Sequence, residues 1–209
     1  MKIDCISDLH GFKPVLEGGD LLIVAGDLTA RDTQEEFNAF CEWIKKQDYK
    51  KKVVIAGNHD GILLDYPYRY IGDAHYLCDS GCEFEGLKIW GSPWTPEFCD
   101  WHFMKERGAP IKEKWDLIPD DTDILITHGP PFGILDQVTI SSRGRGREKF
   151  AGCEELREAM FRVKPKLHVF GHIHSQGGKL VDLVTTICIN AAIMDEDYMP
   201  VNKPIRIEF

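Results

Sequence analysis

The sequence predicts an α/β fold, and three observations support this prediction. Apolar runs rich in β-branched residues recur along the chain and end at turns, as buried strands do, at residues 21–25, 53–56, 124–127 and 167–170. A segment with helical spacing separates the first two runs, which therefore form a βαβ unit with parallel strands. The chain has 209 residues, 43% of them apolar, so we expect one domain, residues 1–209, with a full core.

The first half of the chain supplies three expected strands and one helix. Residues 1–6 and 21–25 form the first two strands, and residues 53–56 form the third. Asp32 or Thr33, with a glutamate three residues later, has the pattern of a capping box that opens the helix. The apolar face of this helix then recurs at helical spacing: Phe37, Phe40, Cys41 and Ile44.

The second half also alternates strands with helical segments. Residues 83–90 resemble a hairpin, and a helix at 152–163 separates strands at 123–127 and 167–170. Two further strands are expected near the end of the chain, the second of them at a sheet edge, at residues 184–189 and 205–207.

Two loops have an unusual composition. Residues 91–103 are rich in proline and aromatic side chains, which either cover the core or offer a stacking wall to a nucleobase or aryl group. Residues 141–149 are basic and glycine-rich. In that segment Arg143, Arg145 and Arg147 either bind a substrate phosphate or belong to a solvated loop.

Composition excludes several classes of partner. The net charge of −9 argues against membrane binding and against an extended nucleic-acid surface. Seven cysteines, an odd number, favour free thiols in a reducing compartment, although Cys78 and Cys82 would also suit a metal pair. The first residues do not resemble a signal peptide, and no run approaches the ~20 apolar residues of a membrane span. We therefore expect a cytoplasmic protein.

Residue types that bind metals follow the ends of five expected strands. They are Asp8, His10, Asp27, Asn58, His59, His128, His172 and His174. Asp8 and His10 are two residues apart, so they would point the same way from extended backbone, as would the last two histidines. Each motif alone also has a simpler interpretation: Asp27 would suit a turn or helix cap, and the Asn-His-Asp sequence a polar loop.

Parallel pairing brings these strand ends to one edge of the sheet, where α/β proteins bind ligands. The set exceeds what one ion needs, so it predicts two ions that share a carboxylate and lie about 3.5–4 Å apart. Ligation by oxygen and nitrogen without thiolate suits transition metals better than calcium. We expect two divalent ions, with manganese first and iron, zinc or nickel as alternatives.

The full set of motifs resembles that of the calcineurin-like metallophosphoesterase superfamily. The resemblance rests on the ordered motifs Asp8-x-His10, Gly26-Asp27, Gly57-Asn58-His59-Asp60, His128 and Gly171-His172-x-His174. Further stretches resemble the metallophosphoesterase-domain-containing branch, which is related to cyclic-nucleotide phosphodiesterases: Asp79-Ser80-Gly81, residues 91–96, 127–131 and 133–136, and residues 152–156. The resemblance implies a four-layer α-β-β-α sandwich of two mixed sheets, with a dinuclear site at the carboxyl ends of the strands.

The resemblance also implies a role for each site residue. Asp27 would bridge two ions, and Asn58 would also contact the phosphate. His59 would act as general acid or stabilise the transition state, completing a catalytic set of His59, Asn58 and Asp27 around a hydroxide that bridges the ions. The implied ligands are Asp8, His10, Asp27 and His174 for one ion, and Asp27, Asn58, His128 and His172 for the other.

One position departs from the protein phosphatases of this superfamily. Those enzymes carry Asp-Arg three and four residues after the bridging aspartate, where this chain has Ala30 and Arg31. The aspartate that would orient the catalytic histidine is therefore absent, which disfavours a protein phosphatase. Arg31 either contacts a phosphate or is a solvated residue at the start of the helix.

These observations predict a metallophosphoesterase, a hydrolase of phosphoric esters. The expected substrate is a small phosphoester, in particular a cyclic or other nucleotide cleaved as a phosphodiester. Alternatives are a phosphomonoesterase, a protein phosphatase or a nuclease, and a scaffold without catalysis. The nuclease is disfavoured because one short basic segment does not make the broad basic face that duplex binding requires. The scaffold is disfavoured because no ligand motif is missing. The oligomeric state is left open.

Overall fold

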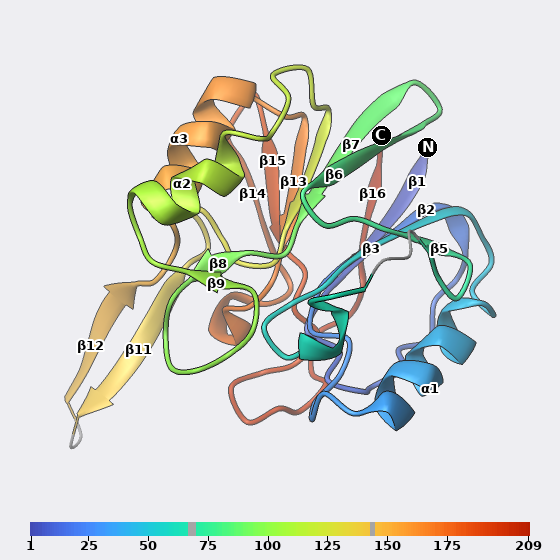
Figure 1. The fold of residues 1–209 in the computed structure, drawn as a ribbon, viewed down its shortest axis with the longest axis horizontal. Coiled ribbons are helices and arrows are strands. Elements are labelled where there is room, and N and C mark those ends of the chain that lie inside the picture. The colour runs from blue at the N-terminus through green and yellow to red at the C-terminus, as the bar shows by residue number, and fades with distance from the viewer. Residues whose placement is uncertain (67–69, 143–144) are drawn as a thin grey trace.

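Two six-stranded mixed sheets lie face to face in the computed structural model, which describes residues 1–66, 70–142 and 145–209 (Figure 1). The first sheet has the order β16-β1-β2-β3-β5-β4. Its strands are β1 (Lys2–Ile6), β2 (Gly19–Ala25), β3 (Tyr49–Ile55), β4 (Tyr70–Ile71), β5 (Ala74–Tyr76) and β16 (Ile205–Glu208).

The second sheet has the order β14-β15-β13-β10-β7-β6. Its strands are β6 (Ser80–Phe84), β7 (Leu87–Ser92), β10 (Ile124–Thr127), β13 (Leu167–Phe170), β14 (Lys179–Asp182) and β15 (Ile187–Asn190). The described helices are α1 (Gln34–Ile44), α2 (Ala109–Trp115) and α3 (Glu154–Val163), with 3₁₀ turns η1 (Gly61–Leu63) and η2 (His174–Gln176). Two small pairs complete the fold: β8 (Thr95–Pro96) with β9 (Met104–Lys105), and β11 (Gln137–Ser142) with β12 (Arg145–Phe150).

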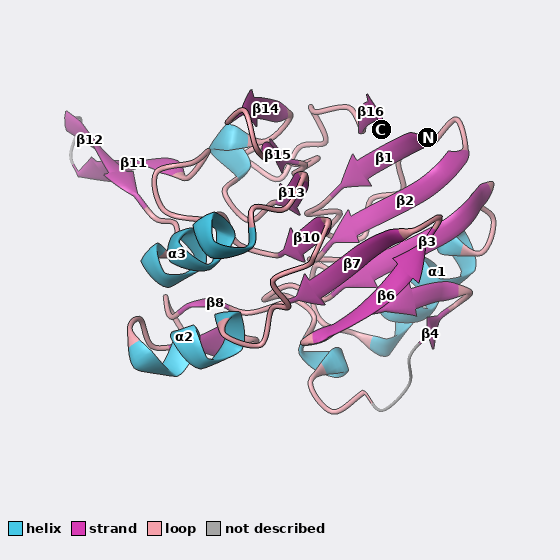
Figure 2. Cartoon of the chain, turned by 90° about the horizontal axis from the view of Figure 1, so that it is seen from above, coloured by secondary structure: helices cyan, strands magenta, loops and turns pink. Residues whose placement is uncertain are grey.

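Three apolar clusters hold four layers together. The central cluster joins the inner faces of the two sheets, with Ile23 of β2 and Ile126 of β10 among its fully buried members. A second cluster packs α1 on the outer face of the first sheet through Phe37 and Phe40. A third packs α2 and α3 on the second sheet, around Trp115. The result is the α-β-β-α sandwich that the resemblance implies, with α1 on one side and α2 and α3 on the other (Figure 2).

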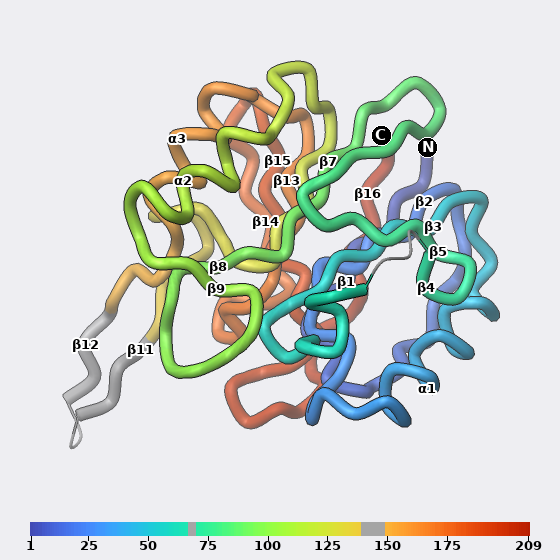
Figure 3. The backbone as a smooth tube through the Cα atoms, in the orientation of Figure 1, coloured from blue at the N-terminus to red at the C-terminus, as the bar shows by residue number. Residues whose placement is uncertain are grey.

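The parallel strands at the centre of the first sheet share one register. Ile23 of β2 lies between Cys5 of β1 and Val53 of β3, so all three strands end at the same edge. In the second sheet β7, β10, β13 and β15 are likewise parallel. The two chain ends lie side by side, where the Phe209 amide donates to the Met1 carbonyl oxygen at 2.8 Å (Figure 3).

Most of the helices and strands expected from the sequence are confirmed, but some of the predicted bounds are wrong. Thr33 caps α1 by accepting the Glu36 amide at 3.2 Å, and β16 lies at a sheet edge. The strand expected from residue 184 begins only at Ile187, because residues 183–186 form a turn between β14 and β15. The sequence reasoning missed both β14 and α2, which are short.

Of the basic segment 141–149, the described residues 141–142 and 145–149 lie in the antiparallel strands β11 and β12 rather than in a loop. This hairpin extends away from the two sheets (Figure 1).

All seven cysteines are free, as expected. The longest described helix, α1, has 11 residues, and no described helix has the length and apolar character needed to cross a membrane.

Candidate metal centre

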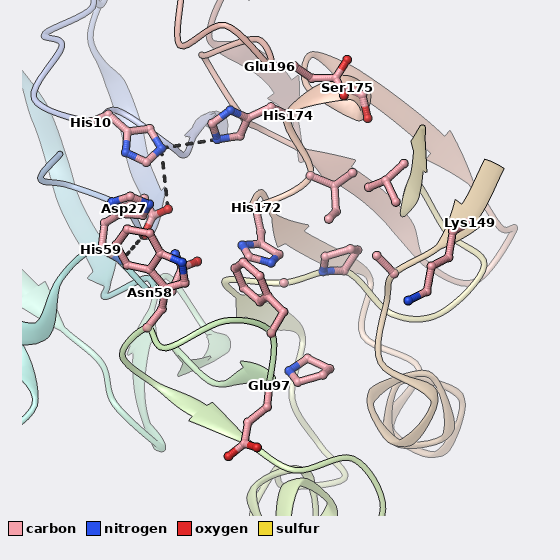
Figure 4. Close-up of a pocket in the computed structure, with 18 of the residues that line it drawn as sticks. His10, Asp27, Asn58, His59, Glu97, Lys149, His172, His174, Ser175 and Glu196 are labelled. Carbon is pink, nitrogen blue, oxygen red and sulfur yellow. Dashed lines mark hydrogen bonds and ion pairs between the residues drawn. The ribbon is translucent and has the colours of Figure 1, made fainter. Parts of the chain in front are cut away.

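The two sheets bring their strand ends together around one cluster of carboxylates and imidazoles. The first sheet contributes residues that follow β1, β2 and β3, and the second sheet contributes residues that follow β10 and β13. His10, Asp27, Asn58, His59, His172 and His174 all line one pocket (Figure 4). Asp8 and His128, both fully buried, lie behind this layer.

The first group of ligand atoms comprises Asp8, His10 and His174. Their ligand atoms all lie within 4.8 Å of one another. Nε2 of His174 lies 3.2 Å from Oδ1 of Asp8 and 3.3 Å from Nε2 of His10. Two nitrogens bound about 2.1 Å from one ion are about 3.0–3.4 Å apart, so this spacing suits shared coordination.

The second group comprises Asp27, Asn58 and His128. Nε2 of His128 lies 3.0 Å from Oδ1 of Asn58 and 3.3 Å from Oδ2 of Asp27. The same Asp27 oxygen lies 3.6 Å from Nε2 of His10, in the first group. Asp27 thus lies between the two groups, as a bridging carboxylate would, and Asp8 also lies within 4.8 Å of the ligand atoms of Asp27 and His128.

Backbone carbonyl oxygens select the imidazole tautomers. Nδ1 of His128 lies 2.9 Å from the Ala25 oxygen, and Nδ1 of His174 lies 2.8 Å from the Asp195 oxygen. A carbonyl oxygen only accepts, so both Nδ1 atoms carry hydrogen. The Nε2 atoms, which face the cluster, are left to bind a metal, as in most histidine sites.

The ligands leave their strands through left-handed turns rather than from extended backbone. Asp8, His10, Asp27 and His172 have φ of 53°, 42°, 52° and 68°. The extended backbone expected for both pairs is therefore wrong, but Asp8 and His10 still converge on one group of ligand atoms, and His172 and His174 line one pocket. Backbone bonds across the sheet hold these turns: the amides of Leu9 and His10 donate to the Asp27 carbonyl oxygen at 2.9 and 3.0 Å.

Two glycines allow the close approach of backbone to ligand. A Cβ at Gly57 would lie 2.3 Å from Oδ1 of Asp27, and one at Gly171 would lie 2.0 Å from Oδ2 of Asp8. Both contacts are shorter than real Cβ contacts allow. The glycines of these motifs therefore make room for the carboxylates.

Asp60 joins two of the ligand turns. Its fully buried carboxylate accepts the amides of Leu28, Thr29 and Gly57 at 2.9–3.0 Å, and the Thr29 hydroxyl at 2.9 Å. The same hydroxyl lies 2.7 Å from the His59 carbonyl oxygen. Asp60 therefore ties the turn that carries Asp27 to the turn that carries Asn58 and His59.

Electrostatics in the cluster favour bound cations. Burial opposes ionisation of Asp27, but the charge and hydrogen bond of His128 lower its pKa to about 2. Burial also opposes ionisation of Asp8, yet hydrogen bonding by His174 and nearby imidazolium charge hold its pKa below the usual range. Burial likewise opposes protonation of His128, but the charge and hydrogen bond of Asp27 raise its pKa to about 9.

The donor set suits divalent metal ions. It offers two ionised carboxylates, an amide oxygen and imidazole nitrogens, and contains no cysteine. Nδ1 of His10 is buried without a partner among the described residues, while its Nε2 faces Asp27 and His174. Burial lowers the pKa of His172 to about 3, so this imidazole is neutral and free to bind a metal.

His59 lies at the edge of the cluster, where one of its ring nitrogens is within 4.8 Å of the ligand atoms of His10 and Asp27. Its backbone amide donates to Oδ1 of Asp27 at 2.8 Å, and its Nδ1 lies 3.1 Å from the Ala30 carbonyl oxygen. Nδ1 therefore carries hydrogen and donates to Ala30. Ala30 is the position where the protein phosphatases have an aspartate, so here a neutral carbonyl orients the histidine.

The pocket has a volume of about 470 Å³, which is within the range of small-molecule sites. Phe98 and Trp101 of the aromatic loop line it, while Phe103 of the same loop is buried in the core. The core-covering interpretation is therefore confirmed for Phe103, and the stacking wall for a nucleobase or aryl group stays a prediction for Phe98 and Trp101.

Sequence reasoning missed several lining residues. Tyr198 has its ring centroid 4.9 Å from that of His10 and 5.2 Å from that of His174. Lys149 lines the pocket at the root of the hairpin, on the side opposite the ligands (Figure 4). The one sequence feature that pointed to Lys149 was its place in the basic segment. No sequence feature pointed to Tyr198.

The structure places the backbone of two of the three arginines named as substrate-binding candidates from the sequence. Arg31 is exposed at the start of α1 and is not among the described residues that line the pocket. Arg143 lies outside the described residues. Arg145 begins β12 at the far end of that strand from the pocket.

Comparisons with known proteins agree with this geometry. A family model of the calcineurin-like phosphoesterases matches residues 1–176. Metallophosphoesterase domain-containing protein 1 of Homo sapiens is 39% identical over 233 residues, which cover 98% of this chain and 69% of that protein. The chain therefore belongs to the calcineurin-like phosphoesterase family, and it is a metal-binding phosphoester hydrolase.

Two more distant relatives extend the comparison. A probable glycerophosphodiester phosphodiesterase of Arcobacter nitrofigilis is 25% identical over 194 residues, covering 82% of this chain and 61% of that protein. The crystal structure of TT1561 of Thermus thermophilus has a TM-score of 0.62 and 15% identity, covering 90% of this chain and 88% of that one. The latter similarity shows the fold alone.

Proposed function

We propose that this hydrolase is a phosphodiesterase that cleaves a small phosphodiester, with cyclic nucleotides and other nucleotides as the first candidates. The proposal rests chiefly on the distribution of charge in the pocket. Among the described residues that line the pocket, the basic side chains are those of Arg107 and Lys149. Arg107 is engaged by the Ala151 and Gly152 carbonyl oxygens and by Glu154, and Lys149 lies away from the ligands.

A phosphomonoester carries a charge of about −1.5 to −2 at neutral pH, whereas a diester carries one negative charge. Among the described side chains that line the pocket, no lysine or arginine free of partners lies beside the ligand cluster to compensate the extra charge of a monoester. Glu97 and Glu196 also line the pocket and would repel it. The apolar walls formed by Phe98 and Tyr198 suit the second substituent of a diester.

The chemistry assigns a part to each side chain. Two divalent ions, held as the sequence resemblance implies and with manganese as the first choice, would neutralise phosphoryl oxygens and activate water. His59, whose Nδ1–H donates to the Ala30 carbonyl oxygen, acts as an imidazolium: it gives its Nε2 proton to the leaving oxygen and is left as the neutral imidazole. The Asn58 amide NH₂ has no protein acceptor among the described residues, so it donates to a phosphoryl oxygen.

A substrate panel on metal-reconstituted protein tests the proposal. It should include an aryl phosphomonoester, an aryl diester, 2′,3′- and 3′,5′-cyclic nucleotides, and oligonucleotides. We expect kcat/KM for the aryl diester to exceed that for the monoester with the same leaving group by about tenfold or more, about 1.4 kcal/mol. A preference for the monoester would overturn the diesterase proposal while leaving phosphoester hydrolysis intact, and efficient oligonucleotide cleavage would favour the nuclease.

A further inference from the structure

Trp101 lies against the imidazole of His59. The two ring centroids are 4.2 Å apart and the ring planes are inclined by 32°, so the contact is a tilted stack. His59 is 9% exposed, and its ring also makes an edge contact with that of His10, at 4.7 Å and 87°. The indole therefore covers one face of the histidine that we assign as general acid.

The backbone next to Trp101 is firmly anchored. The amide of the following residue, His102, donates to the Asn58 carbonyl oxygen at 3.2 Å. Its imidazole Nε2 lies 3.4 Å from the Asp32 carboxylate. Phe103 is 2% exposed in the core, and its carbonyl oxygen accepts the Thr95 amide at 2.9 Å. These contacts tie the backbone on one side of Trp101 to the turn that carries Asn58 and His59, while the indole itself is 43% exposed and meets the His59 ring through the stack.

A single hydrogen bond does not fix an imidazole ring. The bond from Nδ1 to the Ala30 oxygen sets one atom of His59, but the ring can still tilt about it, because the terminal torsion of histidine is broad. The protein phosphatases carry an aspartate at the Ala30 position, and here no carboxylate performs that task. A stacked indole restricts the remaining tilt and adds the attraction between aromatic faces.

We propose that Trp101 is a positioning residue for His59, holding the imidazole so that Nε2 faces the leaving oxygen. This inference rests on the proposed acid role of His59. The inference gives Trp101 a different role from Phe98. Phe98 lines the same pocket, but its ring contacts His172, at 5.0 Å between ring centroids, rather than His59.

A double-mutant cycle tests the inference on metal-loaded protein. The variants are Trp101→Ala, His59→Ala and their combination, assayed with two diesters whose leaving groups are phenol and the more acidic nitrophenol. Small misplacement of a catalytic group costs up to about 10²-fold. We therefore expect Trp101→Ala to lower kcat by about 10–100-fold for the phenol ester and less for the nitrophenol ester, with KM and metal content near the parental values. In the His59→Ala background, removing the indole should cost less than about twofold.

Two further variants keep the result interpretable. Trp101→Phe retains a stacking ring and should recover most of the kcat lost in Trp101→Ala. Phe98→Ala is the matched control, because its loss should be the same with and without His59. If the Trp101→Ala loss appears in KM and persists in full without His59, Trp101 is a substrate wall and the inference is wrong. If His59→Ala alone leaves kcat unchanged for both esters, the proposed acid role fails instead.

Discussion

Nδ1 of His59 lies 3.1 Å from the carbonyl oxygen of Ala30, the residue three positions after Asp27. The sequence indicates that the hydrogen-bond acceptor for the histidine is lost at this position, because the aspartate of the protein phosphatases is replaced by alanine. The structure shows that the backbone itself supplies the acceptor. A neutral carbonyl orients the ring without the strong stabilisation that a carboxylate gives to an imidazolium.

This arrangement predicts how His59→Ala behaves. Metal content should stay near the parental value, because the resemblance implies that His59 acts as an acid rather than as a metal ligand. kcat should fall by about 10²–10⁴-fold for a poor leaving group and by less for nitrophenol, which needs little protonation. Kinetics on a series of phenol leaving groups, with elemental analysis, measures both effects. Loss of one metal equivalent would instead identify His59 as a ligand.

Asp27→Asn should weaken both metal positions together. Its carboxylate lies 3.3 Å from Nε2 of His128 and 3.6 Å from Nε2 of His10, so it serves both groups of ligands. Residues that only support a ligand typically contribute about 10–100-fold to metal affinity or activity, and a bridging ligand should contribute more. Elemental analysis after saturation with Mn²⁺ should fall from two equivalents to fewer than one. The matched control is Asp116→Asn, which removes an exposed carboxylate paired with Lys112. A parent that binds at most one equivalent would contradict the two-ion proposal.

The Asp60 carboxylate should stabilise the fold and the site at once. Asp60→Asn replaces one of two acceptor oxygens by an NH₂ group, which then faces amide donors. Each buried donor left unpaired costs about 1–3 kcal/mol of unfolding free energy. Urea unfolding should show this loss, and metal affinity should fall because the turns of Asp27 and Asn58 are no longer joined. Thr29→Ser keeps the hydroxyl donor and should differ little from the parent, whereas an unchanged stability of Asp60→Asn would refute the role.

The carboxyl-edge cluster could be predicted from the sequence because it depends on local signals. Strand runs that end at Gly26 and Gly57 fix where Asp27 and Asn58 emerge, and parallel pairing brings them together. The left-handed conformation of Asp8 could not be predicted, because it depends on backbone bonds to a neighbouring strand. Tyr198 and Lys149 reach the pocket only through tertiary packing of segments far from the ligand motifs.

Acid should destabilise the fold through His168. Burial lowers the pKa of this fully buried histidine to about 3, from 6.5, so the native state holds it neutral. Between these values the unfolded chain binds a proton that the native state does not, so this contribution is present above pH 6.5 and is lost as pH falls toward 3. The slope approaches about 1.4 kcal/mol per pH unit. The stability difference between the parent and His168→Asn should shrink at that rate between about pH 5.5 and 4, measured by urea unfolding. A constant difference would mean that His168 is not the titrating group.

The hairpin should contribute to substrate binding through its root rather than its arginines. Lys149 and Ala151 line the pocket, and β12 runs from Arg145 to Phe150. At about 3.3 Å per residue, the backbone of Arg145 lies about 13 Å along the strand from that of Lys149. The hairpin also extends away from the two sheets (Figure 1).

Lys149 is the better candidate to meet the distal part of a nucleotide substrate. It lines the pocket opposite the ligands and forms no ion pair with the described residues. Lys149→Ala should raise KM for a nucleotide by about threefold or more, with kcat and metal content unchanged, because the contact lies away from the reacting phosphorus. Arg145→Ala with Arg147→Ala should leave kcat/KM within about twofold of the parent, roughly 0.4 kcal/mol. Steady-state kinetics on a nucleotide and on a small aryl diester separates these outcomes. If the double arginine variant raises KM for the nucleotide and Lys149→Ala does not, the arginines bind substrate and the hairpin must close over the pocket.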